Sequence, residues 1–124
     1  MAGVARRFEL LGRAGAAGRF EFAEYQLGEL EEVFAGPLLA AERPKEGHPE
    51  VLPAMQYSFV EQVVPELRRG IASLDSGVFS AAFARAAARC NGCHEASGHG
   101  FIRVPSAPGR AIPDLDPAPA RATR

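Results

Sequence analysis

Apolar residues recur at steps of three and four along four separate segments of this chain of 124 residues. This spacing places them on one face of a helix, whereas a strand would require strict alternation. The clearest example, from Phe20 to Phe34, is typical of a helix that packs in a bundle. We therefore predict an all-α, four-helix bundle. Its helices are expected at about residues 2–14, 19–35, 50–74 and 78–96.

Glycine and proline mark irregular points within these segments. Gly12, Gly15 and Gly18 should weaken and end the first helix, because glycine in a helix costs about 1 kcal/mol relative to alanine. Pro65 lies inside the third apolar pattern and cannot donate a hydrogen bond to the carbonyl of Glu61. We therefore expect a kink there. The third apolar stripe is expected to comprise Leu52, Met55, Phe59, Val63, Leu67, Ile71 and Leu74.

The last helix carries local signals at both ends. Asp75 or Ser76 is expected to cap its start, and Gly98 is the expected left-handed residue after its end. Residues 103–124 include five prolines, so they cannot form a regular helix or a central strand. We predict a helical domain over residues 1–102 and an extended Pro-rich tail over residues 103–124. The tail is expected to dock through Phe101, Ile102, Ile112 and Leu115.

Composition excludes several classes of protein. The net charge is −1, with no basic excess, so nucleic acid is not an expected partner. No apolar run approaches the length of a membrane span. We see no pair of side chains arranged for acid–base chemistry, and we expect no enzymatic activity. The glutamates of the second helix are expected to form a solvated acidic face: Glu21, Glu24, Glu29, Glu31 and Glu32.

One pentapeptide, Cys90-Asn91-Gly92-Cys93-His94, combines the only two cysteines of the chain with a histidine. C-x-x-C-H is the attachment signature of a c-type haem. Two thiols three positions apart on a helical turn can each add to one vinyl group of the same porphyrin, and the imidazole can ligate its iron. We therefore predict one covalently attached haem c, held by Cys90 and Cys93, with His94 as the proximal iron ligand.

Other interpretations of the pentapeptide stay open. A zinc site could recruit Cys90, Cys93, His94 and His99, although adjacent side chains on a helix point about 100° apart. A redox dithiol would be expected in a strand–helix context. Either would make the chain a haem-free helical interaction module. A pentapeptide without function at a helix end is the remaining alternative.

Residues around the motif are candidates for contacts with a haem. The Ala86–Ala87 pair should leave room for a flat ring one turn before the cysteines. Arg85, Arg89 and Arg103 could pair with propionates, because guanidinium matches carboxylate geometry, or could stay solvated. His99 could bond a propionate, cap the helix end or lie on the surface.

Four amphipathic helices with C-x-x-C-H near the end of the last resemble the cytochrome c-prime superfamily of four-helix haem proteins. The stretch from Cys90 to Ile102 is also similar to bacterial periplasmic cytochrome-like proteins that follow the haem motif with Gly-His-x-Phe-Ile. The resemblance covers about residues 1–96. It implies an antiparallel up-down-up-down bundle, in which the end of the fourth helix lies beside the starts of the first and third.

This topology places the sixth iron ligand near Met1, His48 or Met55. Members of the superfamily with Met/His ligation take a methionine from the start of the first helix, which favours Met1 here. Met55 is more often a core residue than a ligand. The c-prime members leave the position open behind an apolar residue. In that case the distal wall would consist of Val4, Phe8 and Leu11.

We therefore expect a periplasmic mono-haem cytochrome that carries electrons to or from a redox partner protein. The alternative is a five-coordinate haem protein that binds NO or CO. The periplasm is expected because bacteria attach haem covalently outside the cytoplasmic membrane, although Glu9 and Arg13 interrupt any secretory signal after Arg6 and Arg7. A homodimer through an exposed face of the first or second helix stays open.

Overall fold

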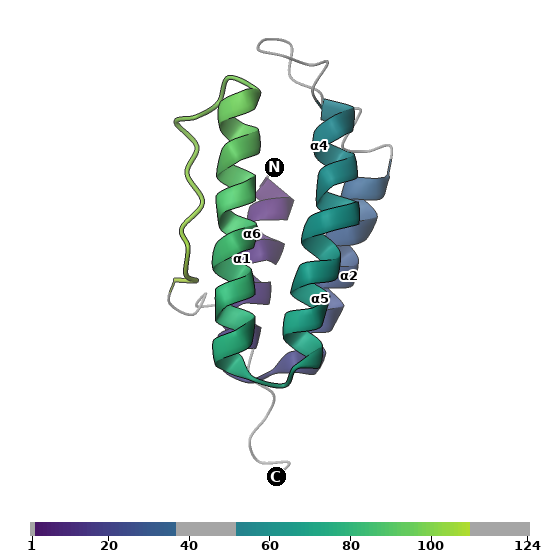
Figure 1. Ribbon diagram of the computed structural model, residues 1–124, viewed down its shortest axis with the longest axis vertical. Helices are drawn as coiled ribbons and strands as arrows, with labels where there is room; N and C mark the ends of the chain where they lie inside the picture. Colours follow the sequence, from purple (N-terminus) through teal and green to yellow (C-terminus); the bar gives the residue numbers. More distant parts are fainter. Residues whose placement is uncertain (1, 37–51, 110–124) are drawn as a thin grey trace.

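The computed structural model describes residues 2–36 and 52–109. These residues form helices and no strand. The helices are α1 (Ala2–Ala16), α2 (Phe20–Ala35), α4 (Leu52–Ser58), the π-helical turn η2 (Phe59–Val63), α5 (Val64–Ala72) and α6 (Ser76–Ala96). Because α4, η2 and α5 are continuous, they make one long third helix (Figure 1). The described chain is thus an all-helical bundle, as predicted.

Each helix of the bundle packs against two neighbours. α1 lies against α2 and α6, and α5 lies against the same two helices. Short links join α1 to α2 and α5 to α6, and both links lie at the lower end of the molecule in Figure 1. One core runs between the helices. Its largest fully buried side chains are Leu11, Leu27, Leu30, Val64, Leu67, Phe79 and Phe83.

Two glycines of α1 lie within the helix rather than at its end. A Cβ on Gly12 would lie 2.5 Å from the Phe83 ring, and one on Gly15 would lie 2.1 Å from the Phe79 ring. The expectation that both residues help to end the first helix is therefore wrong, because their missing side chains make room for two rings of α6. Gly18, with φ of 77°, does follow the end of α1.

The irregularity expected near Pro65 takes the form of a π-helical turn. The backbone N–H of Val64 donates to the carbonyl of Phe59, five residues earlier. The helical hydrogen bonds have therefore changed from the four-residue to the five-residue spacing before the proline. This turn keeps α4 and α5 in one helix although Pro65 lacks a donor. The helix ends at Ala72, and Leu74, with φ of 57° and 72% of its surface exposed, does not belong to the buried stripe.

Both predicted signals at the ends of α6 are confirmed. Asp75 Oδ1 accepts hydrogen bonds from the backbone N–H of Gly77 (2.8 Å) and of Val78 (3.0 Å), so Asp75 is the N-cap. Gly98, with φ of 84°, follows the C-terminal end. These caps fix the length of the helix that carries the cysteine motif.

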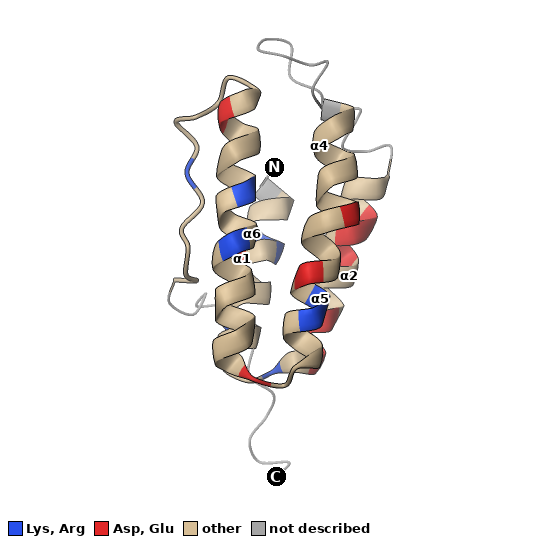
Figure 2. Cartoon of the chain, viewed as in Figure 1, with Lys and Arg blue, Asp and Glu red and all other residues tan. Residues whose placement is uncertain are grey.

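The acidic face of α2 is partly paired rather than simply solvated. Arg68 of α5 bridges Glu24 at 3.0 Å and Glu31 at 3.2 Å, and Arg7 of α1 lies 3.4 Å from Glu29. Figure 2 shows the acidic groups of α2 beside the basic groups of α5. The described helices include none that is long and apolar enough to cross a lipid bilayer.

The C-terminal segment, residues 97–109, turns back and runs along α6 (Figure 1). Val104 packs against the core, whereas Phe101 is 79% exposed. The expected docking through Phe101 is therefore wrong, and Ile102, which is 39% exposed, contributes its backbone instead. Ile112 and Leu115 lie outside the described residues.

Candidate functional site

A cavity of about 790 Å³ lies between the helices, around the C-terminal half of α6. It is lined by α1, α2, α6, the α4 and η2 parts of the long third helix, and the C-terminal segment. Its volume is within the range typical of small-molecule and cofactor sites, about 300–1,000 Å³. From α6 the lining includes Phe83, Arg89, Cys90, Cys93 and His94.

Two stacked aromatic pairs form much of the cavity wall. Phe8 of α1 stacks on Phe83 of α6 with ring centroids 4.4 Å apart, and Phe34 of α2 stacks on Phe59 of η2 at 3.8 Å. Such walls suit a flat, apolar ligand. The Ala86–Ala87 pair, in contrast, is buried in the helix contacts and does not line the cavity. The prediction that Ala86 and Ala87 leave room for a flat ring is therefore wrong, and the two aromatic pairs border the space instead.

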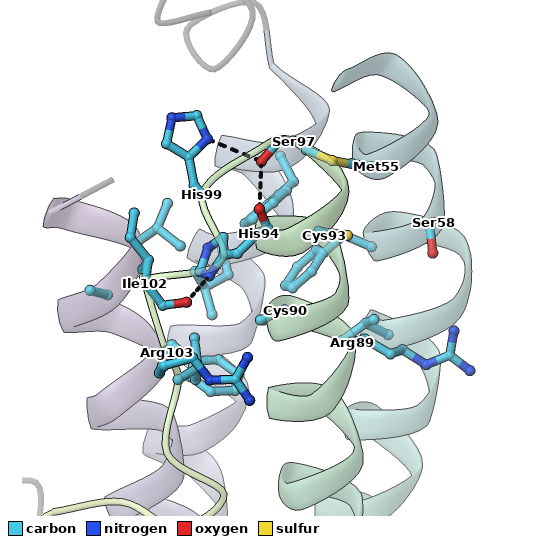
Figure 3. Close-up of a pocket in the computed structure, with 18 of the residues that line it drawn as sticks. Met55, Ser58, Arg89, Cys90, Cys93, His94, Ser97, His99, Ile102 and Arg103 are labelled. Atoms are coloured by element: carbon cyan, nitrogen blue, oxygen red, sulfur yellow. Dashed lines mark hydrogen bonds between the residues drawn. The ribbon is translucent and has the colours of Figure 1, made fainter. Parts of the chain in front are cut away.

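The structure brings Cys90, Cys93 and His94 together at this cavity (Figure 3). All three side chains are half-buried on the last turns of α6. Both cysteines are free thiols. The three residues of the sequence motif thus face one space, which is the arrangement that shared attachment to one porphyrin requires.

His94 is held by the C-terminal segment. Its Nδ1 lies 3.0 Å from the backbone carbonyl oxygen of Ile102. Because a carbonyl oxygen can only accept, Nδ1 must carry a proton in this hydrogen bond, and in the neutral ring Nε2 then keeps its lone pair. Metal-ligating histidines usually donate their second ring N–H in this way, which fixes the tautomer and the ring orientation.

Burial disfavours the thiolate form of both cysteines. It raises the pKa of the Cys90 thiol to about 11, and the neighbouring Cys93 adds to that rise. Burial also raises the pKa of Cys93, against the opposing positive charge of Arg89. Reactive dithiols usually have a lowered pKa, so these thiols do not resemble a redox dithiol.

His99 lines the same cavity as Cys90 and Cys93, but its ring nitrogen bonds another partner. Its Nδ1 lies 3.2 Å from the hydroxyl of Ser97, which itself donates to the carbonyl of His94 at 3.1 Å. Since the hydroxyl has a single proton, His99 Nδ1 is the donor in the first bond. No group of three or more His, Cys, Asp or Glu side chains in the described ranges is arranged to hold a metal ion. The four-ligand zinc site considered for Cys90, Cys93, His94 and His99 is therefore not formed.

Only part of the expected distal side lies in the described residues. Met1 and His48 fall outside them. Met55 lines the cavity and is half-buried rather than part of the core. Val4 and Phe8 line the cavity as expected, whereas the expectation for Leu11 is wrong, since its fully buried side chain lies in the helix core.

Two of the three arginine candidates line the cavity. Arg89 donates to Gln62 at 2.7 Å, and Arg103 pairs with Glu95 at 3.1 Å. Arg85 is not part of the lining and pairs with Glu66 at 2.6 Å. Arg89 and Arg103 therefore remain the candidates for anionic groups of a bound cofactor.

Sequence reasoning missed Asn91, Ser97 and the backbone of Ile102 to Val104. Asn91 donates to the carbonyl of Val104 at 3.0 Å and accepts from its N–H at 2.7 Å. These contacts join residues 13 positions apart through backbone atoms, which leave no trace in side-chain patterns. The presence of Asn91 inside the pentapeptide was the only available signal.

Comparison with protein-family models, with curated proteins and with solved structures found no significant match to this chain. The functional conclusions below therefore depend on the motif and on the geometry of the cavity.

Proposed function

We propose that this chain is a mono-haem c-type cytochrome of the bacterial periplasm that carries electrons. The observation that carries the proposal is the convergence of Cys90, Cys93 and His94 on one aromatic-lined cavity of about 790 Å³. An attachment motif alone could occur by chance on a surface helix. A motif whose three chemical groups line a cavity of cofactor size is much better explained by a bound haem.

The residues of the cavity fit the group that the motif implies. Cys90 and Cys93 would hold the porphyrin through thioethers, and His94 would offer Nε2 to the iron, because its Nδ1 bonds the Ile102 carbonyl. Arg89 and Arg103, at the cavity, would pair with the propionates. Haem c, when bound, supplies a one-electron couple between ferric and ferrous iron.

The remaining residues would set the environment of that couple. The stacked Phe8–Phe83 and Phe34–Phe59 pairs would give a bound haem an apolar surrounding. A low-dielectric surrounding and the hydrogen bond of the axial histidine are two of the main influences on a haem reduction potential. No side chain of the cavity needs to transfer a proton, so the proposal includes no enzymatic step.

Membership of the cytochrome c-prime superfamily, with up-down-up-down helices, is part of the proposal. It is supported by the two short links at the same end of the bundle and by the position of the motif near the end of α6. The periplasmic location follows from the proposal, because covalent haem attachment in bacteria occurs on that side of the membrane. A redox partner protein is then the expected partner.

The test is covalent attachment. The full chain is expressed in a bacterial host that attaches c-type haem, and its intact mass is measured after denaturation and extraction with acidified solvent. We expect one haem to stay bound to the wild type, and C90S/C93S to lose all covalent haem. Ser106→Ala, at an exposed position of the C-terminal segment, should retain it. A wild-type chain without added mass contradicts the proposal.

A gas-binding haem protein is the second candidate. It is favoured by the described part of the α1 side of the cavity, where Val4, Ala5 and Phe8 offer no iron ligand and the Glu9 carboxylate accepts a hydrogen bond from the Gly109 N–H. An iron ligated only by His94 would bind NO or CO at its sixth position. Binding of CO by the reduced protein separates this candidate from an electron carrier with two protein ligands.

A further inference from the structure

We propose that Asn91 is a positioning residue that sets the tautomer and orientation of His94 through the C-terminal segment. The inference deepens the proposed function. It rests on that function only for the identity of the group bound by His94 Nε2, whereas the positioning itself can be tested without haem.

The first step is the pair of hydrogen bonds between Asn91 and Val104. The Asn91 Nδ2 donates to the Val104 carbonyl at 3.0 Å, and its Oδ1 accepts from the Val104 N–H at 2.7 Å. One side-chain amide thus satisfies both polar groups of one backbone residue, as a neighbouring strand would. Val104 also packs against the core, which holds this part of the segment on α6.

The second step is the fixed position of the Ile102 carbonyl. On one side, the Ile102 N–H donates to the carbonyl of His99 at 2.9 Å, within the turn that follows α6. On the other side, the backbone of Val104, two residues after Ile102, is hydrogen-bonded to the Asn91 side chain. Figure 3 shows the Ile102 carbonyl that accepts from His94 Nδ1, and the two flanking contacts hold this carbonyl from both directions.

The third step is chemical. A neutral imidazole has one N–H, so the Ile102 carbonyl decides which ring nitrogen keeps the lone pair. With Nδ1 protonated, Nε2 keeps its lone pair and can ligate a metal ion. A hydrogen-bonded second nitrogen also raises the basicity of a ligating histidine, and loss of such outer partners typically changes metal affinity or activity by 10–100-fold.

Asparagine is the appropriate side chain for this role. Asn91→Asp keeps the acceptor for the Val104 N–H but loses the donor for its carbonyl, so it should weaken the contact without abolishing it. Asn91→Ala removes both bonds. Gly92→Ala is the matched control, because it lies in the same pentapeptide and its new Cβ would meet nothing within 4 Å.

The first experiment uses the full chain without haem. Long-range ¹H–¹⁵N correlation spectra report the tautomer of His94. We expect the Nδ1–H form in the wild type and in Gly92→Ala, a reduced share in Asn91→Asp, and loss of this preference in Asn91→Ala. If Asn91→Ala does not fold, Asn91→Asp decides. An unchanged tautomer in the folded variants overturns the inference.

The second experiment uses the haem-loaded chain. A less basic His94 stabilises ferric iron less, so Asn91→Ala should raise the reduction potential, and Asn91→Asp should raise it by a smaller amount. A tenfold change in the one-electron equilibrium corresponds to about 59 mV. A loaded Asn91→Ala with the wild-type potential overturns the inference and leaves the proposed function intact. A wild type that attaches no haem defeats the proposed function, while the tautomer result still decides the role of Asn91.

Discussion

The two ends of this bundle use the same four helices in opposite ways. Near the α5–α6 turn, the Phe79 ring fills the space that Gly15 leaves on α1, and this ring is almost fully buried. Around the C-terminal half of α6, the helices surround a cavity of about 790 Å³. Protein interiors are ordinarily close-packed, with few voids larger than a water molecule. The packed end therefore supplies stability, whereas the cavity end leaves the space that our proposal assigns to a haem.

Removal of one ring from each end should break this comparison most strongly. Phe79→Ala is expected to cost about 3–5 kcal/mol in the free energy of unfolding, because it opens a void in a filled core. Phe34→Ala should cost clearly less in the haem-free chain, since this half-buried side chain already borders the cavity. Urea denaturation measures both values. Equal losses would show that the two ends do not differ in packing.

A smaller change tests the close approach of α1 and α6. Gly15→Ala would place a Cβ 2.1 Å from the Phe79 ring, and the overpacking should cost about 1–3 kcal/mol. Gly28→Ala is the control within α2, since its Cβ would meet nothing within 4 Å. It should stabilise the protein by up to about 1 kcal/mol, the difference in helix propensity. Thermal unfolding separates the two, and a stabilising Gly15→Ala contradicts the packing described.

The smallest effect concerns the thiols at the cavity end. Thiolate is the form that reacts with iodoacetamide, and burial raises the pKa of Cys90 from 9.0 to about 11. In haem-free Cys93→Ser, the alkylation rate should therefore keep rising above pH 9. The neutral thiol favours the folded state, so its contribution to stability is present below pH 9 and is lost toward pH 11. A rate that levels off below pH 9 argues against a buried Cys90.

The parts of the fold that depend on local chemistry could be predicted from the sequence. Asp75 caps α6 and Gly98 follows it, because each signal needs only its own neighbours. The roles of Gly12 and Gly15 could not be predicted. They depend on which ring of another helix lies opposite, and a single sequence gives no such pairing.

The same distinction holds at the candidate site. The pentapeptide located Cys90, Cys93 and His94, which the structure places around one cavity. The hydrogen bond from His94 to the Ile102 carbonyl and the Asn91 contacts could not be predicted, because they join side chains to backbone atoms across a turn. The sixth iron ligand stays a prediction, since Met1 and His48 lie outside the described residues.

The most direct test is the absorption spectrum of the chain made in a host that attaches c-type haem, recorded oxidised, reduced, and reduced with CO. We expect a Soret band, and sharp reduced bands that do not change with CO, as for an electron carrier whose iron has two protein ligands. A broad high-spin spectrum that shifts with CO would favour gas binding instead. The absence of any Soret band would contradict the assignment of this cavity to haem.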